Sequence, residues 1–375
     1  MFAPYDLARA GGVGNQVRAQ ARALRQLGHD VRVYGPASTS LGGGETAITG
    51  AVTVTFGGTE SGIGLDPRGA FRVARLFAAR EFDIVHVHEP LVPVLPWFVV
   101  RRARAPVVAT FHVHRETGHR WYAMARPWLR SLLDRVDCRI AVSEPARRTV
   151  AQYFPAAYEI VPNGIDVGAF RASRPPAAAL SSGRLHVVYV GRLEPRKGVD
   201  HLIRAMARVQ RALPDANLVI VGDGPEQRRL IDVARALAVH VQFTGRVHDA
   251  DLPGYVQAAD VVCSPAIGGE SFGVVLLEAM ACEKPIVASR IEGYETLVGP
   301  AACGVLVPPG DDEALSQALL TLLQDRPLRQ TLGARGLHAA RQHDWSSIAR
   351  VLEGIYCRVV AARRRDRLAP HTFEH

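Results

Sequence analysis

The chain has 375 residues, which is more than one ordinary α/β domain needs and enough for two compact cores. Hydrophobic residues make up 48% and charged residues 22%, near the globular average, and this excludes a largely disordered protein. The net charge of +9 is uneven, because residues 1–165 carry 20 Arg against 13 acidic residues, a net of +7. A basic first half suits phosphates, an anionic membrane surface or nucleic acid as partners.

Cysteine usage and hydropathy bear on the compartment. The five cysteines form no Cys-x-x-Cys pair and are expected to be buried thiols in a reducing environment. The chain opens without the regions of a signal peptide, and its longest apolar run, residues 91–100, contains two prolines, so we expect no transmembrane helix. These features predict a cytoplasmic protein, and peripheral contact with the inner face of the plasma membrane stays open.

Short apolar runs alternate with amphipathic helical stretches along the chain. Residues 1–5 resemble only the end of a buried strand; either a few residues precede them in the gene or the first strand is very short. Further strands are expected at 31–34, 52–56, 84–88, 107–111 and 139–142, then at 186–190, 218–221, 241–243, 261–263, 286–288 and 305–307. Helices are expected at 13–27, 67–79, 199–213 and 313–323. This alternation predicts parallel sheets covered by helices on both faces, hence an α/β protein with two doubly wound, Rossmann-like domains.

The domain boundary is expected in the middle of the chain. Turn residues occupy 161–166, and the Pro- and Ala-rich segment 171–183 lacks periodicity and is a candidate linker. We therefore expect one domain over residues 1–165 and a second over residues 166–345. Residues 345–368 are expected to form one long helix with a basic end.

A glycine loop stands between the first strand remnant and the first helix. Gly11, Gly12 and Gly14 would let backbone amides and the helix N-terminus approach a phosphate or a sugar. Such loops are common, so the loop alone is weak evidence for a ligand site.

A basic turn follows the first strand of the second half. Gly191 opens it, and Arg192 and Lys197 can both reach a diphosphate, Arg by bidentate pairing and Lys as a point charge. Lys197 is one of only two lysines in the chain. Because the turn lies at the carboxyl end of a strand, a ligand site is favoured over an exposed basic loop.

Two glutamates, Glu270 and Glu278, stand eight positions apart around an apolar segment. A helix is expected to begin near Ser271, with Glu270 in the loop before it and Glu278 two turns into it. Carboxylates accept hydrogen bonds from sugar and ribose hydroxyls. Glu278 lies inside an apolar run, where an unpaired charge would be unfavourable, so a ligand site is favoured over two surface glutamates that cap a helix. The amides at the helix N-terminus are expected to bind an anion. Residues placed in that site are Ser271, Phe272 and Gly273.

These motifs occur in one order together with Val-His-Val-His-Glu-Pro at 85–90, Thr-Phe-His at 110–112, Pro-Asn-Gly-Ile-Asp at 162–166 and Val-Gly-Asp-Gly-Pro at 221–225. The chain thereby resembles the GT-B retaining glycosyltransferases of family four, and within them most the phosphatidyl-myo-inositol mannosyltransferases. The resemblance covers nearly the whole chain. It implies two Rossmann-like domains facing a central cleft, with a last helix, about 346–368, packing back on the first domain.

The resemblance also implies roles for the motif residues. Arg192 and Lys197 would hold the diphosphate of a nucleotide-sugar, Glu270 the hexose hydroxyls and Glu278 the ribose, while Gly12 belongs to a loop that closes on the diphosphate. His112 would lie beside the sugar and the acceptor. Cations and amides would stabilise the departing diphosphate without a metal or any other cofactor. Retention would follow from front-face attack or from a short-lived covalent intermediate. The candidate catalytic residues are therefore His112, Arg192, Lys197 and Glu270.

The histidines at 86, 88, 112 and 114 alternate along two strands and invite comparison with a metal site. No carboxylate or cysteine framework completes a tetrahedral set, so we expect no metal.

Donor and acceptor identity are inferred from fewer residues. Asp249, near where the base should sit, could accept from guanine N1–H and N2–H together, which favours a GDP-sugar over a UDP-hexose. The resemblance implies mannose as the sugar, hence GDP-mannose. The acceptor is expected to be a glycan or a phosphoinositide-type lipid, with Tyr5, Arg68 and His112 as candidate contacts. Arg68, Arg72 and Arg75 share a helix face that also offers Phe71 and Phe77, which suits either an anionic lipid surface or plain solvation.

Segment 113–120 departs from the longer, lysine-containing loop of the lipid mannosyltransferases, and Arg115 or Arg120 are candidate replacements for its phosphate-binding lysine.

Other functions remain as alternatives. A transferase using a UDP-sugar and a soluble acceptor fits the same motifs. A non-hydrolysing sugar epimerase shares the architecture, but Arg192, Lys197 and the paired glutamates argue against it. Nucleic-acid binding is not expected, because the basic residues are not interleaved with aromatics in a recognisable motif. The sequence carries no signal for the oligomeric state or the linkage formed.

Overall fold

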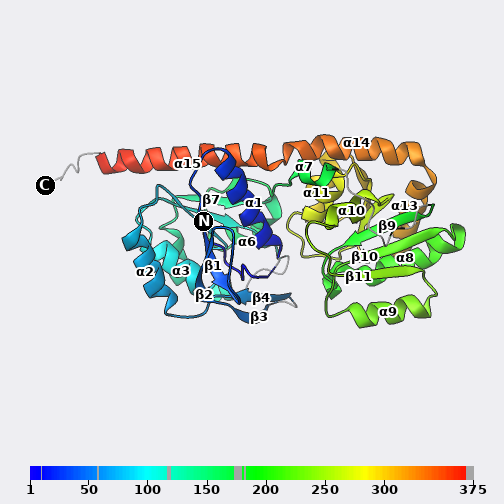
Figure 1. The fold of residues 1–375 in the computed structure, drawn as a ribbon, viewed down its shortest axis with the longest axis horizontal. Coiled ribbons are helices and arrows are strands. Elements are labelled where there is room, and N and C mark those ends of the chain that lie inside the picture. Colours follow the sequence, from blue (N-terminus) through cyan, green and yellow to red (C-terminus); the bar gives the residue numbers. More distant parts are fainter. Residues whose placement is uncertain (10, 57–58, 116–119, 173–179, 181–182, 369–375) are drawn as a thin grey trace. The chain divides into compact units, whose positions relative to one another are not determined.

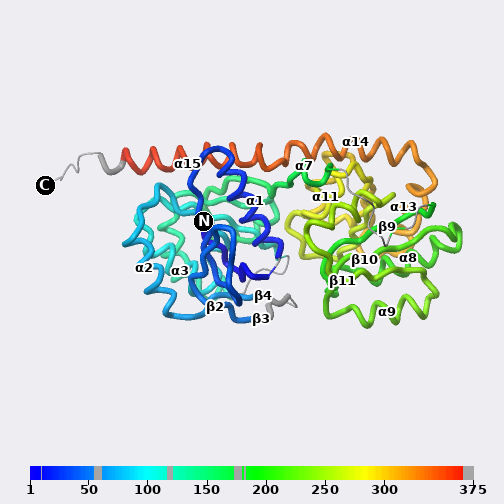
Figure 2. Tube along the Cα trace, viewed as in Figure 1, coloured from blue at the N-terminus to red at the C-terminus, as the bar shows by residue number. Residues whose placement is uncertain are grey.

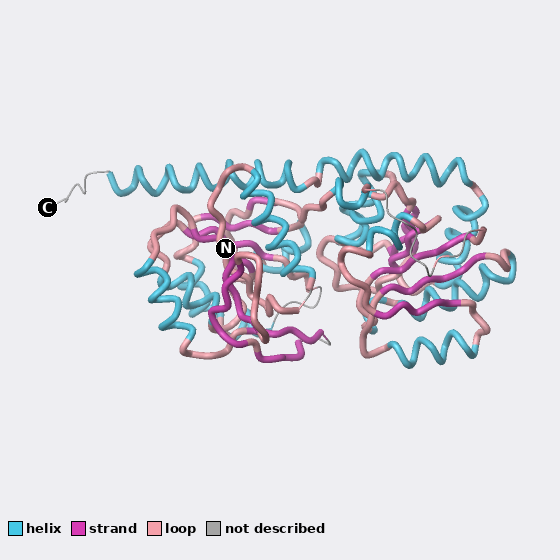
Figure 3. The backbone as a smooth tube through the Cα atoms, viewed as in Figure 1, coloured by secondary structure: helices cyan, strands magenta, loops and turns pink. Residues whose placement is uncertain are grey.

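The protein is described here by a computed structural model that covers residues 1–9, 11–56, 59–115, 120–172, 180 and 183–368 (Figure 1). The chain divides into two compact units, of which the first comprises Met1–Gly164 and Trp345–His375 and the second Ile165–Asp344. In each unit helices surround a sheet of strands, an α/β arrangement (Figure 3). The divisions fall one residue before the positions expected from the sequence, 165/166 and 345/346.

Segment 171–183 does not connect the two units, contrary to the expectation from its composition. The chain passes from one unit to the other between Gly164 and Ile165. The turn residues there lead directly into helix α7 (Val167–Arg171) of the second unit, with the Asp166 side chain as its N-cap. Most of the predicted linker, residues 173–179 and 181–182, lies outside the described residues.

A parallel sheet organises the first unit. Phe2 bridges to Tyr34 and to Val87, so the strand remnant at the start of the chain lies between β1 (Val33–Ala37) and β5 (Val85–His88). The order is therefore β2, β1, the Phe2 segment, β5, β6, β7, β8, with its first segment in the middle, as in a Rossmann fold. The remaining strands are β2 (Glu45–Gly50), β6 (Val107–Phe111), β7 (Cys138–Ala141) and β8 (Glu159–Ile160).

Residues 52–56 form a strand outside this sheet, whereas the sequence suggested a member of the parallel series. β3 (Val52–Phe56) pairs antiparallel with β4 (Thr59–Ile63) as a two-stranded ribbon. Val52 is 52% exposed, Thr53 is exposed and Val54 is half-buried, so this strand lacks the two covered faces of a strand in a parallel sheet. β2 and β8 were not predicted, because neither contains a continuous apolar run.

Helices cover both faces of the first sheet. Val107 packs in the cluster beneath α2 (Gly69–Ala79) and α3 (Leu95–Arg102), whereas Val108 packs with α1 (Gly12–Gln26) and α15 (Trp345–Leu368). Neighbouring residues of a strand point to opposite faces, so the two helix pairs lie on opposite sides. The first and last helices of the chain, α1 and α15, are side by side in this unit (Figure 2). The other helices are α4 (Arg120–Met124), α5 (Arg126–Leu133) and α6 (Glu144–Ala151).

Six parallel strands form the sheet of the second unit, in the order β11-β10-β9-β12-β13-β14. The chain adds β10 and β11 on one side of β9, and then β12, β13 and β14 on the other side, so the strand order reverses between β9 and β12. In open α/β sheets, ligands bind beyond the carboxyl ends of the strands at this point. The strands are β9 (Leu185–Val190), β10 (Ala216–Val221), β11 (Val241–Gly245), β12 (Val261–Ser264), β13 (Ile286–Ser289) and β14 (Gly304–Val307). All six runs were predicted from the sequence.

The helices of the second unit besides α7 are η1 (Pro195–Lys197), α8 (Val199–Ala212), α9 (Gln227–Ala236), α10 (Leu252–Gln257), α11 (Val274–Ala281), α12 (Glu292–Ala301), α13 (Asp312–Gln324) and α14 (Arg326–Gln342). Within the described part of the chain, no helix has the length and apolarity needed to cross a bilayer.

Candidate active site

Two loops of the second unit meet at the carboxyl ends of β9 and β12, where the strand order of the sheet reverses. One follows β9 and carries Lys197; the other follows β12 and carries Glu270. The Lys197 ammonium nitrogen lies 2.7 Å from a Glu270 carboxylate oxygen, and the Arg196 guanidinium pairs with the same oxygen. Two residues proposed from the sequence are thus in direct contact.

Glycine allows these loops to approach each other. Gly198 has a φ of +62°, and a Cβ there would lie 2.2 Å from the carbonyl oxygen of Pro265 in the loop after β12. Close by, the amide of Ile267 donates to the carbonyl of Arg196 at 2.9 Å. A side chain at 198 would force the loops apart and separate Lys197 from its carboxylate partner.

Glu194 is a site residue that the sequence reasoning missed. Its side chain is only 1% exposed, and its carboxylate oxygens lie 3.0 Å from Nε of Arg192 and of Arg196. A buried carboxylate between two guanidinium groups orients both of them and compensates their charge. The signal that was available is the Glu placed among the cations of residues 192–197.

The electrostatics of Glu270 follow from its partners. Burial alone would raise the pKa of this carboxyl, but Lys197 and Arg196 outweigh burial and hold the pKa below its ordinary value. Glu270 is therefore ionised at neutral pH and can accept hydrogen bonds from hydroxyl groups.

Helix α11 begins at Val274, and not near Ser271 as expected. Gly273 precedes it with a φ of +89°, a left-handed conformation that cannot continue a helix, and a Cβ there would meet the Tyr294 ring at 2.9 Å. In the part of the chain that the structure describes, no side chain caps this helix end. The Phe272 side chain is buried in the core against His343, so only the backbone of Phe272 is available to a ligand.

Glu278 lies on the second turn of α11. Among the described residues, its buried Oε2 has no hydrogen-bond partner. Burial, and then the charge of Asp249, raise the pKa of Glu278 to about 8. The two residues proposed for the ribose and the base are therefore close enough to interact. A buried oxygen without a partner suits a ligand hydroxyl as donor.

The amino end of α1 lies in the first unit. Gly11 is its N-cap and Gly12 its first residue, with no side-chain cap and no acidic residue in the first turn. Both glycines are exposed, and a Cβ on either would meet no atom of the described residues within 4 Å. The backbone at this helix end is therefore exposed, and the anion site expected here from the glycine motif stays a prediction.

A cluster of buried histidines lies at the carboxyl ends of β5 and β6. His112 Nε2 is 3.0 Å from His88 Nδ1, and His86 contacts Thr110 Oγ1 at 2.7 Å and Tyr356 Oη at 2.6 Å. Burial lowers the pKa of His112 to about 4, and it lowers the pKa of both other histidines well below its ordinary value. The cluster is therefore neutral at pH 7. The described residues contain no group of three or more His, Cys, Asp or Glu that could hold a metal ion.

Glu89, directly after β5, was part of a motif but received no role from the sequence. Its carboxylate accepts the amides of His112 and Val113. Burial raises the pKa of Glu89 to about 7, although these hydrogen bonds oppose the shift. Tyr5 is near enough that Glu89, after burial, raises the pKa of its hydroxyl. Tyr5 and His112, two of the three candidate acceptor contacts, thus lie around one buried carboxyl group.

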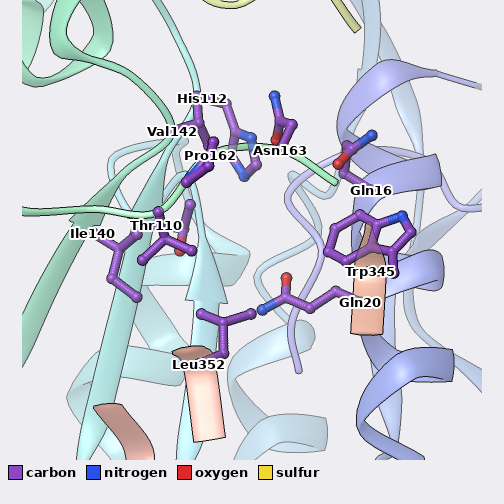
Figure 4. A pocket seen from close by; sticks show the side chains of 11 residues that line it. Gln16, Gln20, Thr110, His112, Ile140, Val142, Pro162, Asn163, Trp345 and Leu352 are labelled. Atoms are coloured by element: carbon purple, nitrogen blue, oxygen red, sulfur yellow. The ribbon is translucent and has the colours of Figure 1, made fainter. Parts of the chain in front are cut away.

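A small pocket opens beside His112 (Figure 4). Gln16, Gln20 and Trp345 stand on one side of it, and Thr110 and Val142 on the other. The full lining is Gln16, Gln20, Thr110, His112, Ile140, Val142, Val161, Pro162, Asn163, Trp345 and Leu352. All of these residues belong to the first unit.

The third candidate acceptor contact, Arg68, precedes α2 and is exposed. Phe71 is 67% exposed, with the Arg75 guanidinium 5.9 Å from its ring centroid, and Arg72 is exposed too. We call these four residues the α2 patch. Phe77, which the sequence placed on the same face, packs instead against Phe2 in the core.

Of the candidate lysine replacements, Arg115 is half-buried, whereas residues 116–119 and the side chain of Arg120 lie outside the described residues.

Comparison with known proteins agrees with this architecture. Residues 10–169 match Glycosyltransferase Family 4, and residues 173–338 match Glycosyl transferases group 1. The chain is 35% identical to a phosphatidyl-myo-inositol mannosyltransferase of Mycobacterium leprae, covering 98% of this chain and 99% of that protein. It is 32% identical to a GDP-mannose-dependent monoacylated alpha-(1-6)-phosphatidylinositol monomannoside mannosyltransferase of Corynebacterium glutamicum, covering 77% and 80%.

Among solved structures, sucrose-phosphate synthase from Thermosynechococcus elongatus superposes with a TM-score of 0.75 at 24% identity, covering 96% of this chain and 98% of that one. That likeness shows the fold. The family matches, the identity over nearly the full length and the fold together establish that this chain belongs to the GT-B glycosyltransferases of family four.

Proposed function

We propose that this glycosyltransferase transfers mannose from GDP-mannose to a phosphatidylinositol-type lipid, with retention of the anomeric configuration. The observation that carries the proposal is the contact between Lys197, Arg196 and Glu270 at the sheet reversal of the second unit. It offers cations to a diphosphate and a carboxylate to a sugar at one point. The names of the relatives supply the lipid and the mannose.

The donor would be bound by the second unit. Arg192 and Lys197 contact the diphosphate, where negative charge grows as the glycosidic bond breaks, so they stabilise the transition state more than the ground state. Glu270, ionised at neutral pH, accepts from the hexose hydroxyls. Glu278 accepts from the ribose through its buried oxygen, and Asp249 accepts from the guanine edge.

The acceptor would be bound by the first unit. His112 is neutral, so its uncharged ring can lie beside the acceptor hydroxyl. A protonated ring would attract the anionic diphosphate and so compete with the cations proposed to bind it. Tyr5 lies near the buried Glu89 carboxyl group, which also accepts the amide of His112. Retention requires the acceptor oxygen to enter on the face from which the diphosphate leaves.

Docking at a lipid surface would use the α2 patch. Its three arginines can pair with anionic head groups while the Phe71 ring enters the interface. Such an enzyme would act as a peripheral protein at the cytoplasmic face of the plasma membrane, where nucleotide-sugar and lipid meet.

The test is transfer by the purified protein. Liposomes with and without phosphatidylinositol are incubated with GDP-mannose, GDP-glucose or UDP-glucose, and the lipids are analysed by mass spectrometry. We expect one hexose on phosphatidylinositol with GDP-mannose alone. Transfer only from a UDP-sugar would contradict the donor, and transfer only to a soluble acceptor would contradict the lipid.

A further inference from the structure

Glu89 is buried in a backbone conformation that residues other than glycine seldom adopt. Its φ is +47°, in the left-handed region, and the residue is 1% exposed. A left-handed backbone and a buried carboxyl group are both unfavourable, so contacts made by this side chain must offset them.

Those contacts converge on the residues that follow β6. The Glu89 amide donates to the Thr110 carbonyl at 2.8 Å and so continues the ladder between β5 and β6. Its Oε1 then accepts the amide of Val113 at 2.9 Å and also the amide of His112. One carboxylate oxygen therefore fixes two successive peptide groups where the chain leaves the sheet.

We propose that Glu89 is a positioning residue for the acceptor side of the active site. It fixes the backbone of His112, while His88 holds the imidazole from the other side at 3.0 Å. With backbone and ring both fixed, the imidazole keeps one orientation toward the acceptor. Because Glu89 is buried, it acts through His112 and does not touch the substrate. The inference rests on the proposed function, in which His112 lies beside the acceptor.

The opposite end of β6 offers a matched control. There the Asp137 carboxylate accepts the amide of Val107 at 2.8 Å, so it fixes the start of the same strand as Glu89 fixes its exit. Loss of either carboxylate removes side-chain support for β6, but only Glu89 acts on His112.

The experiment compares Glu89→Ala, Glu89→Gln and Asp137→Ala with the wild type. Kinetics with phosphatidylinositol liposomes and GDP-mannose give kcat and KM for acceptor and donor separately, and calorimetry gives the Kd for GDP. Glu89→Ala should lower kcat/KM for the acceptor by about 10- to 100-fold, the usual effect of removing a group that orients a site residue. Its GDP affinity should stay within about twofold of wild type, since Arg192, Lys197 and Glu278, which are proposed to bind the nucleotide, lie in the other unit.

The other variants separate positioning from general stability. Glu89→Gln keeps an oxygen that accepts from the amides and should recover acceptor kcat/KM to within about fivefold of wild type. Asp137→Ala should leave acceptor kinetics unchanged. Equal acceptor losses in Asp137→Ala and Glu89→Ala, or none in Glu89→Ala, would overturn the proposal. If Glu89→Ala does not fold, Glu89→Asp, too short to reach both amides, should show the acceptor-specific loss, and wild-type kinetics would overturn the proposal.

An NMR measurement is independent of the substrates. The Cε1–H resonance of His112 should shift in Glu89→Ala and stay unchanged in Asp137→Ala. If the wild type transfers no mannose to phosphatidylinositol, the proposed function fails while this resonance still tests positioning. An unchanged resonance in Glu89→Ala would overturn the role of Glu89 whatever the substrates are.

Discussion

Buried polar groups at the sheet reversal of the second unit are charged and paired, whereas those at the ends of β5 and β6 in the first unit are neutral. Glu270 keeps its charge because Lys197 and Arg196 hold its pKa below the ordinary value, and Glu194 is paired with Arg192 and Arg196. His86, His88 and His112 instead remain uncharged, because burial disfavours their protonated forms.

The contrast fits the proposal that the second unit binds the donor and the first binds the acceptor. A departing diphosphate gains negative charge, which fixed cations stabilise. An acceptor hydroxyl is neutral until it reacts and needs orientation more than charge. The net +7 of residues 1–165 is thus not concentrated in the interior of the first unit, and the α2 patch accounts for part of it on the surface.

Removing a cation from the ion-pair cluster of the second unit, formed by Arg192, Glu194, Arg196, Lys197 and Glu270, should have the largest effect on activity. Lys197→Ala deprives the diphosphate of a point charge and should lower kcat/KM by about two orders of magnitude or more. The control is Lys284→Ala, which removes the only other lysine of the chain, located beyond the carboxyl end of α11. It should retain near-normal turnover. A Lys197→Ala enzyme as active as this control would remove the loop after β9 from the active site.

The surface charge of the first unit can be tested next. Replacing Arg68, Arg72 and Arg75 by Gln should weaken binding to anionic liposomes by roughly 100-fold at low salt, since each of the three cations near such a surface contributes about 1 kcal/mol. Wild-type binding should itself weaken as salt rises. Co-sedimentation measures both effects, and calorimetry should show unchanged GDP affinity.

The matched triple replaces the exposed Arg208, Arg211 and Arg235 of the second unit by Gln and removes the same charge. It should bind liposomes like the wild type. Equal loss in both triples would mean that net charge, and not the α2 patch, directs binding.

Glu278 is the exception in the second unit, because burial and Asp249 raise its pKa to about 8. If its ionised form accepts from the ribose, GDP affinity should rise roughly tenfold between pH 7 and pH 9, as the ionised fraction rises. Calorimetry in buffers of different ionisation enthalpy should also detect proton release on binding at pH 7. Both effects should be reduced in Glu278→Gln, and an identical pH profile in that variant would assign the titration to another group.

The Glu278 carboxyl group also makes the free energy of unfolding depend on pH, in a direction that follows from its raised pKa. Its folded pKa lies above the ordinary value of 4.5, so its contribution to the free energy of unfolding is complete below about pH 4.5 and is lost as the pH rises to about 8. The stability of Glu278→Gln should fall less than that of the wild type across this range.

The smallest effect is expected in the neutral cluster of His86, His88 and His112 in the first unit. Tyr356→Phe removes the hydroxyl that lies 2.6 Å from His86 Nδ1 and 3.4 Å from Gln20 Nε2, and it should lower the free energy of unfolding by about 1–3 kcal/mol. Urea unfolding measures the loss. Tyr158→Phe, which removes a more local bond to the Phe154 carbonyl, should cost less. A Tyr356→Phe protein as stable as the wild type would show that the histidine cluster does not need this contact.

Sequence patterns predicted the two sheets wherever strands are buried on both faces. Runs such as 186–190 and 218–221 are almost continuously apolar, which is typical of parallel strands. The same rule misplaced 52–56 as a parallel strand and missed β2 and β8, because strands with exposed residues carry a weaker apolar pattern. Segment 171–183 appeared to be a linker from its composition, but composition does not show where the chain crosses between units.

What the sequence by itself determined is the set of candidate site residues and their local settings: a lysine and arginines after a buried strand, a carboxylate before an apolar helix, and a histidine at a strand end. Only the tertiary structure decided which of them meet. β9 and β12 are neighbours in the sheet, and this brings Arg196 to Glu270 across 74 positions of sequence. It also decided that Glu194 and Glu89 are buried supports, because a carboxylate's partners are fixed by packing between segments distant in the sequence.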